Sequence, residues 1–141
     1  MLIPAFHAYR TSDYDKLGTT IPYDGTSLNT DNSLDTAKGV FTAPVNGLYY
    51  FYFSATKKWG IPILTIRLMK NDAGISTKEV RLQANGTSGP ANNILSVDLH
   101  ASFALNVNDT VKVNLVAGAT IDSKEPIQRF TTFTGFLIQP I

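Results

Sequence analysis

Apolar and polar residues alternate along several stretches of this sequence, whereas helical spacing is hard to find. In residues 93–105, an apolar residue occupies every second position from Leu95 to Leu105. A period of two places alternate side chains on opposite faces, so this pattern predicts a β-strand with one face in a core. The Asn108–Asp109 turn and the alternation from Val111 to Leu115 then predict a partner strand and a hairpin.

Further stretches are rich in the Val, Ile, Phe, Tyr and Thr residues that favour strands. Clusters of Gly, Pro, Asn and Asp separate them, and no stretch has the helical pattern that a crossover between parallel strands would need. The chain is therefore predicted to be all-β, a β-sandwich of two antiparallel sheets with about ten strands. These strands are expected at 5–9, 47–56, 63–69, 77–83 and 129–138, and turns at 11–18, 24–34, 71–74, 85–93 and 117–126.

The segment 47–53 is apolar or aromatic on both faces. One face can fill a core, but the second face of an antiparallel sheet normally meets solvent, and here it would leave an aromatic patch exposed on a monomer. Tyrosine suits interfaces, so we interpret the second face as a contact between subunits. The alternative is a central strand buried beneath a long loop. The core set is Tyr49, Phe51 and Phe53, and the interface set is Leu48, Tyr50 and Tyr52.

Length, charge and cysteine content narrow the classes of partner and chemistry. The 141 residues fit one domain, and 12 basic against 11 acidic residues, without runs of either sign, argue against nucleic acid or acidic lipid as a ligand. The lack of cysteine excludes disulfides, zinc thiolate sites and thiol nucleophiles. The sequence shows no signal peptide and no membrane span, so we expect no membrane insertion.

A set of spaced aromatic, Asn, Leu and Gly residues resembles a family signature. These positions match the globular head of complement C1q and its relatives, including cerebellin and adiponectin, which share a jelly roll with the tumour necrosis factor ligands. The one departure is Tyr23, where the family has Phe. The matching residues are Tyr23, Asn29, Leu34, Phe41, Gly47, Tyr49, Phe51 and Phe53.

The resemblance extends over nearly the whole chain. Residues 4–8 are similar to the family's first strand, 39–45 to the entry into the signature and 133–137 to the last strand. It implies a single jelly-roll domain over residues 1–141. Gly47 would let the chain enter a strand where a side chain could not fit, and the rings would fill the space between two sheets. We assign to this core signature Tyr23, Phe41, Gly47, Tyr49, Phe51, Phe53, Phe133, Gly135 and Phe136.

Catalytic motifs are lacking in the sequence. It has two histidines, His7 and His100, and shows no nucleophile elbow, zinc-type His spacing or phosphate-binding Gly loop. His100 and Asp98 share the polar face of their strand, yet no nucleophile or oxyanion donor can be named beside them. The sequence therefore predicts a protein that is not an enzyme and that needs no cofactor, with calcium as the one candidate ion.

The calcium hypothesis comes from the resemblance. Relatives hold calcium near a trimer axis with acidic side chains, and Asp72 matches the first position, whereas the second falls near Glu79 or Val80. Calcium takes about six to eight oxygen ligands. The competing interpretation, which we favour, is that Asp72 is a plain turn aspartate.

Three loop features were also candidates for surface roles. Asn85-Gly86-Thr87 and Asn108-Asp109-Thr110 are glycosylation sequons, and Trp59 lies in a predicted loop. Trp59 could stack on a sugar or a partner, or fold back over the edge of the sandwich.

The resemblance implies a secreted, extracellular homotrimer that binds carbohydrate, microbial-surface or protein ligands, in the lectin-like manner of soluble family members in innate immunity. The alternative is a trimeric signalling or matrix-scaffold head that binds a cell-surface receptor or aligns a stalk. The sequence does not identify the ligand-binding residues.

Overall fold

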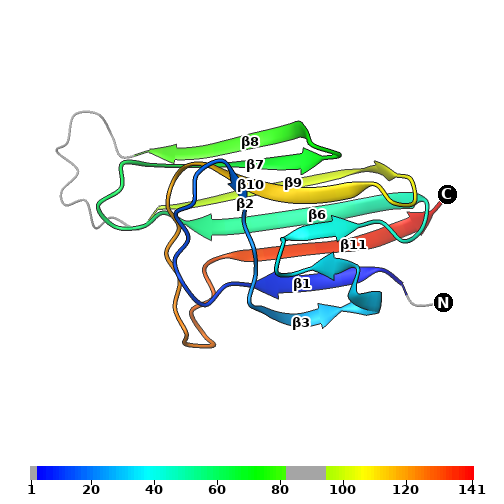
Figure 1. Ribbon diagram of the computed structural model, residues 1–141, viewed down its shortest axis with the longest axis horizontal. Helices are drawn as coiled ribbons and strands as arrows, with labels where there is room; N and C mark the ends of the chain where they lie inside the picture. Colours follow the sequence, from blue (N-terminus) through cyan, green and yellow to red (C-terminus); the bar gives the residue numbers. More distant parts are fainter. Residues whose placement is uncertain (1–2, 82–94) are drawn as a thin grey trace.

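The computed structural model describes residues 3–81 and 95–141, which form two antiparallel sheets facing each other (Figure 1). In spatial order, the first sheet contains β3 (Gly25–Asn29), β1 (Ala5–Tyr9), β11 (Thr132–Pro140), β6 (Gly47–Thr56) and β9 (Ser96–Leu105). The second sheet contains β4 (Leu34–Asp35), β5 (Val40–Thr42), β10 (Thr110–Gly118), β7 (Ile63–Lys70) and β8 (Ala73–Arg81), and β2 (Thr19–Thr20) pairs with β10. A turn of 3-10 helix, η1 (Thr30–Asn32), follows β3. The predicted β-sandwich is confirmed, with eleven strands in the described residues.

The two ends of the sandwich differ. β1 begins and β11 ends at one end, whereas the segments 57–62 and 119–131 lie at the opposite end (Figure 1). We call this opposite end the distal end. The turn between β7 and β8, which contains Asp72, lies at the end where β11 stops.

β6 organises the first sheet because it pairs along its length with both β9 and β11. Alternation along β6 turns Tyr49, Phe51 and Phe53 inward, where they are fully buried. The same alternation turns Leu48, Tyr50 and Tyr52 outward. β9 also turns its predicted core face inward, because Val97, Leu99 and Leu105 are buried.

The core between the sheets is built from aromatic rings of several strands. Phe6 on β1 lies 4.9 Å from Phe133 on β11 and 5.3 Å from Phe41 on β5, measured between ring centroids. Phe41 in turn lies 5.5 Å from Phe51 on β6. Edge and tilted contacts of this kind add to the stabilisation from burial alone. Tyr23, the departure from the signature, is buried and stacks on Phe133 at 5.8 Å.

Two glycines allow this close packing. A Cβ atom at Gly47 would lie 2.3 Å from Leu137 Cδ1 and 2.9 Å from the carbonyl oxygen of Gln139, so no other residue fits where β6 begins. A Cβ at Gly135 would lie 2.6 Å from the Phe6 ring and 2.7 Å from the Phe51 ring. Glycine here makes room for the rings of two other strands.

Two expectations were wrong. Phe136 does not belong to the core: it lies one position from the buried Leu137 on β11, so alternation turns it outward, and it is 40% exposed. Residues 24–34 were expected to be turn, yet they contain β3, an edge strand paired with β1. Its side chains are mostly exposed, so it lacks the apolar alternation on which the prediction relied.

Several predicted boundaries also shifted. β8 begins at Ala73, directly after the turn at Asn71 and Asp72, rather than at residue 77. β10 continues to Gly118, and β11 begins at Thr132 rather than 129. The expected turn at 85–93, the last two residues of the strand expected at 77–83 and the start of the one expected at 93–105 lie outside the described residues.

Replacing Phe51 with alanine is expected to lower the free energy of unfolding by about 3–5 kcal/mol, because it removes a fully buried ring and leaves a cavity between the sheets. Urea unfolding followed by circular dichroism measures the loss. Leu17→Ala, at an exposed loop position, should change the same quantity by less than about 1 kcal/mol. Equal effects of the two changes would contradict the core described above.

Candidate functional site

The outer face of the first sheet carries an aromatic surface. Cross-strand pairing places Tyr50 beside Phe136 on β11, and their ring centroids lie 5.4 Å apart. On the other side, the Tyr50 ring stacks at 6.3 Å on His100 of β9. We call Leu48, Tyr50, Tyr52, Phe136 and His100 the aromatic face.

The aromatic face is partly open to solvent in one copy of the chain. Leu48 is 36% exposed and Phe136 40%, while Tyr50 and Tyr52 are half-buried. The three residues predicted for the subunit contact therefore lie together on one face. Phe136, which the sequence analysis assigned to the core, extends this surface onto the neighbouring strand.

Polar groups border the aromatic face. The Tyr52 hydroxyl donates a hydrogen bond to Asp98 Oδ2 at 3.3 Å. Desolvation, together with the negative charge of Asp98, raises the pKa of Tyr52 above its ordinary value. His7 Nδ1 lies 2.7 Å from Thr134 Oγ1 on the same side of the sheet. The two histidines thus contact a tyrosine ring and a threonine hydroxyl rather than the partners of a catalytic pair.

Asp72, the candidate calcium ligand, pairs with a basic side chain of its own chain. Its Oδ1 lies 2.7 Å from Lys112 Nζ, and the Asp72 side chain is 82% exposed. Glu79, a candidate second position, lies six residues beyond the first residue of β8, about 20 Å along an extended strand. Its carboxylate instead binds Arg81 and Thr65. Within residues 3–81 and 95–141, no group of three or more His, Cys, Asp or Glu could hold a metal ion.

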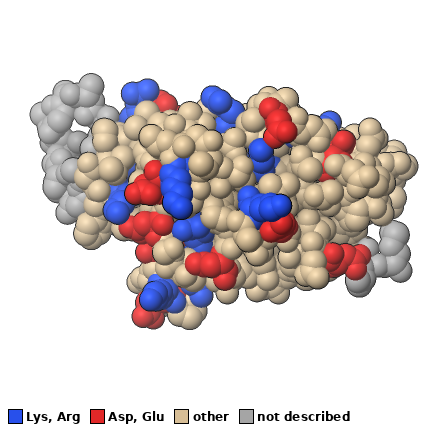
Figure 2. Space-filling model, viewed as in Figure 1, with Lys and Arg blue, Asp and Glu red and all other residues tan. Residues whose placement is uncertain are grey.

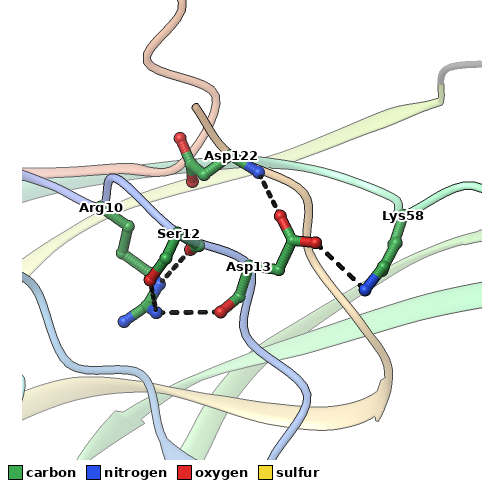
Figure 3. Close-up of polar contacts among 5 residues, drawn as sticks. All are labelled: Arg10, Ser12, Asp13, Lys58 and Asp122. Carbon is green, nitrogen blue, oxygen red and sulfur yellow. Dashed lines mark hydrogen bonds and ion pairs between the residues drawn. The ribbon is translucent and has the colours of Figure 1, made fainter. Parts of the chain in front are cut away.

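At the distal end, a polar network joins segments far apart in the sequence (Figure 3). The Arg10 guanidinium is buried and donates to the carbonyl oxygens of Ser12 and Asp13 at 3.1 Å and of Pro22 at 2.8 Å. Asp13 Oδ1 accepts the backbone N–H of Asp122 at 2.9 Å, and its Oδ2 pairs with Lys58 Nζ at 3.1 Å. Asp13 therefore ties together the loops that follow β1, β6 and β10.

Asp122 is the perturbed acid of this network. Its Oδ1 accepts the backbone N–H of Phe130 at 3.1 Å, whereas its Oδ2 is buried without a hydrogen-bond partner in the described residues. Desolvation by burial raises the pKa of Asp122 to about 6. The Thr131 hydroxyl lies near the Asp122 carboxylate and partly opposes the rise in its pKa. Like Asp122 Oδ2, Thr131 Oγ1 is buried and has no hydrogen-bond partner of good geometry in the described residues.

Beside this acid, the distal end has a pocket of about 280 Å³. Trp59, which is 54% exposed, forms part of its wall, so the tryptophan singled out in the sequence borders a pocket. Segment 119–131 supplies most of the other residues that line the pocket. Sequence reasoning did not find this site, because its walls come from separate loops. The lining includes Trp59, Ile121, Asp122, Ser123, Gln128 and Phe130.

Charged side chains do not gather into a patch of one sign on the face shown in Figure 2, where basic and acidic groups are interspersed. Of the two sequons, Asn108 is exposed in the turn between β9 and β10, and Asn85 lies outside the described residues. Among the described residues, no helix is long and apolar enough to cross a membrane.

The two-sheet jelly roll with this aromatic core places the chain in the class of all-β jelly-roll domains. Comparisons with known proteins then give its family. The C1q domain matches residues 5–138. The chain is 29% identical to mouse and human complement C1q tumor necrosis factor-related protein 3 over 134 residues, 95% of this chain and 50% of those proteins. It is 32% identical to zebrafish Caprin-2 over 136 residues, 95% of this chain and 14% of that protein. The chain belongs to the C1q domain family, and it spans about half the length of the first relatives it matches.

Solved structures share the fold. The globular domain of zebrafish complement 1qA superposes with a TM-score of 0.75 at 21% identity, over 98% of this chain and 99% of that one. Murine APRIL superposes with a TM-score of 0.67 at 12% identity, over 94% and 98% of the two chains. These likenesses confirm the jelly roll predicted from the resemblance.

Asp122→Asn tests the buried acid. Because the pKa is raised in the folded chain, the proton favours folding, and this contribution is lost as the pH rises through about 6. We therefore compare the free energy of unfolding of the variant with that of the unsubstituted chain at each pH. The variant's advantage over the unsubstituted chain is expected to be about 1 kcal/mol larger at pH 7.5 than at pH 5. Urea unfolding at both pH values gives the difference. Ser123→Ala, a neighbour that does not titrate, should show no such change, and an equal change in both variants would refute a raised pKa.

Proposed function

We propose that this chain is an extracellular recognition domain that acts by binding, without catalysis, as a homotrimer. The aromatic face carries the proposal. One copy leaves the rings of Tyr50, Tyr52 and Phe136 partly in water, and contact with further copies around an axis would remove this apolar area from solvent. The C1q domain family, to which the chain belongs, is typically trimeric, which supports the same arrangement.

The composition of the aromatic face suits an interface between subunits. Aromatic residues are enriched at the cores of interfaces, and charged residues are depleted there. The five residues of the face include no Lys, Arg, Asp or Glu, and Asp98 lies beside them, with its carboxylate accepting the Tyr52 hydroxyl. In the assembled protein, this interface would have an aromatic centre with polar groups at its rim.

Within this proposal, the ligands are carbohydrate, microbial-surface or protein groups, bound in a lectin-like role of innate immunity. Three copies would multiply weak single sites into useful avidity on a repeating surface. The interspersed charges of Figure 2 support recognition by shape and hydrogen bonds rather than by a strong field.

A trimeric head that binds a receptor or aligns a stalk is the second candidate. The observation that favours it is length: the domain occupies only half of complement C1q tumor necrosis factor-related protein 3. Binding to receptor-bearing cells that no sugar inhibits would favour this second candidate.

Light scattering at micromolar concentration is expected to give about 46 kDa, three times the 15.4 kDa of one chain. Replacing Tyr50 and Tyr52 with serine should weaken assembly at least tenfold, because the variant has less apolar area to bury. Its far-UV circular dichroism should stay β-type. Ile75→Ser, at an exposed position on β8 of the second sheet, should leave the mass unchanged.

A monomeric original chain would overturn the trimer. An unfolded double variant would show that the two tyrosines belong to the core rather than to an interface. Calcium chloride added in the same experiment tests Asp72: a calcium-dependent mass that Asp72→Asn abolishes would show that assembled chains form the site that one chain lacks.

A further inference from the structure

Loops supply most of the lining of the pocket at the distal end, and among the described residues the one that lines it from a strand is Thr56, the last residue of β6. None of the five residues of the aromatic face lines the pocket. The segment 119–131, which supplies most of the lining, lies at the opposite end of the sandwich from the last residue of β11 (Figure 1).

The charges of the lining disfavour an anionic ligand. Asp122 is in the lining, and no Lys or Arg is. Three basic side chains of the distal end have other contacts: Lys58 pairs with Asp13, Arg10 donates to backbone carbonyl oxygens, and Arg129 lies over the Tyr9 ring and donates to the carbonyl oxygen of Ser123. A carboxylate or sulfate entering the pocket would meet Asp122 with no Lys or Arg of the lining to balance its charge.

The polar groups of the lining can both donate and accept. Ser123 Oγ accepts the backbone N–H of Glu125 at 3.1 Å, which leaves its O–H able to donate. The Gln128 side chain is exposed and has no hydrogen-bond partner in the described part of the chain, so its amide offers both a donor and an acceptor. Asp122 adds an acceptor through Oδ1, which in the described residues accepts only the backbone N–H of Phe130. A ligand with several hydroxyl groups around a ring would use all three.

The apolar part of the lining suits the carbon face of such a ring. Trp59 presents a broad, half-exposed indole, and Ile121 and Phe130 extend the apolar wall. A quaternary ammonium ligand would also fit an aromatic ring and a carboxylate, but it would leave the hydroxyl and amide without partners. The volume of about 280 Å³ is just below the range for drug-sized ligands, so it suits a single ring.

From this lining we propose that the distal pocket is a saccharide site for one neutral sugar ring, with the ring's carbon face on Trp59 and its hydroxyls hydrogen-bonded to Asp122, Ser123 and Gln128. This inference rests on the proposed recognition function and names its ligand class. The single-site Kd should be on the order of 1 mM, as expected for about a dozen ligand atoms. Three sites in one assembly would raise the avidity for a surface that repeats the sugar.

The test uses the full chain, whose single tryptophan reports on the pocket. Tryptophan emission is followed during titration with methyl glycosides of glucose, galactose, mannose and N-acetylglucosamine. Sialic acid serves as the anionic probe and choline as the cationic probe. At least one neutral glycoside should give a saturable change, and sialic acid and choline should give none.

Variants then locate the binding, measured by saturation-transfer NMR because one of them lacks the tryptophan. Trp59→Ala and Gln128→Ala should each weaken it at least tenfold. Ile127→Ala is the matched control, since Ile127 lies in the same loop, is 92% exposed and does not line the pocket. Circular dichroism checks the fold, and Gln128→Ala decides the question if Trp59→Ala does not fold.

Three results would overturn the inference. The first is a flat titration with every neutral glycoside up to 100 mM, about a hundredfold above the expected Kd. The second is saturable binding of sialic acid or choline alone. The third is binding of a neutral sugar that both variants leave unchanged. In the last case the recognition function stands and only the site fails. A monomeric mass in light scattering would instead refute the trimer, whatever the titrations give.

Discussion

The packing of rings between the two sheets is the constraint on which the structure depends. Phe6, Phe41, Phe51 and Phe133 come from β1, β5, β6 and β11 and meet at centroid distances of 4.9–6.4 Å. Gly135 lies opposite Phe51 in the register of β11 with β6, and any side chain there would occupy the space of two rings. The first and last strands are thereby held as neighbours in the centre of one sheet. Their loops then meet at the distal end.

The aromatic face follows from the same constraint. A strand that turns Tyr49, Phe51 and Phe53 into the core must turn Leu48, Tyr50 and Tyr52 outward, because the side-chain period is two. The outward residues thus lie on a strand that is paired on both sides, with β11 and with β9, which suits an assembly surface. The pocket is formed mostly by loops, so ligand contacts can vary there without disturbing the core.

The sequence predicted the parts that depend on local alternation. Residues 47–53 and 95–105 showed both the core face and the outward face of their strands. The same rule would have placed Phe136 outward, since it is three residues from Phe133, but the resemblance grouped it with the core. β3 was missed because its exposed edge position leaves no apolar pattern to detect. The pocket was missed because Trp59, Asp122 and Gln128 come together only through long-range contacts such as the hydrogen bond between Asp13 and Asp122.

The distal network also explains how a carboxylate can remain in that pocket without a cationic partner. Arg10 carries the charge that could neutralise Asp122, yet its donors hold the carbonyl oxygens of Ser12, Asp13 and Pro22. Its positive charge only partly offsets the desolvation that raises the pKa of Asp122. Arg10 thus fixes the loop after β1, and Asp13 extends that order to the pocket wall. A wall ordered before a ligand arrives loses little conformational entropy on binding, which is what a small, weakly held ligand requires.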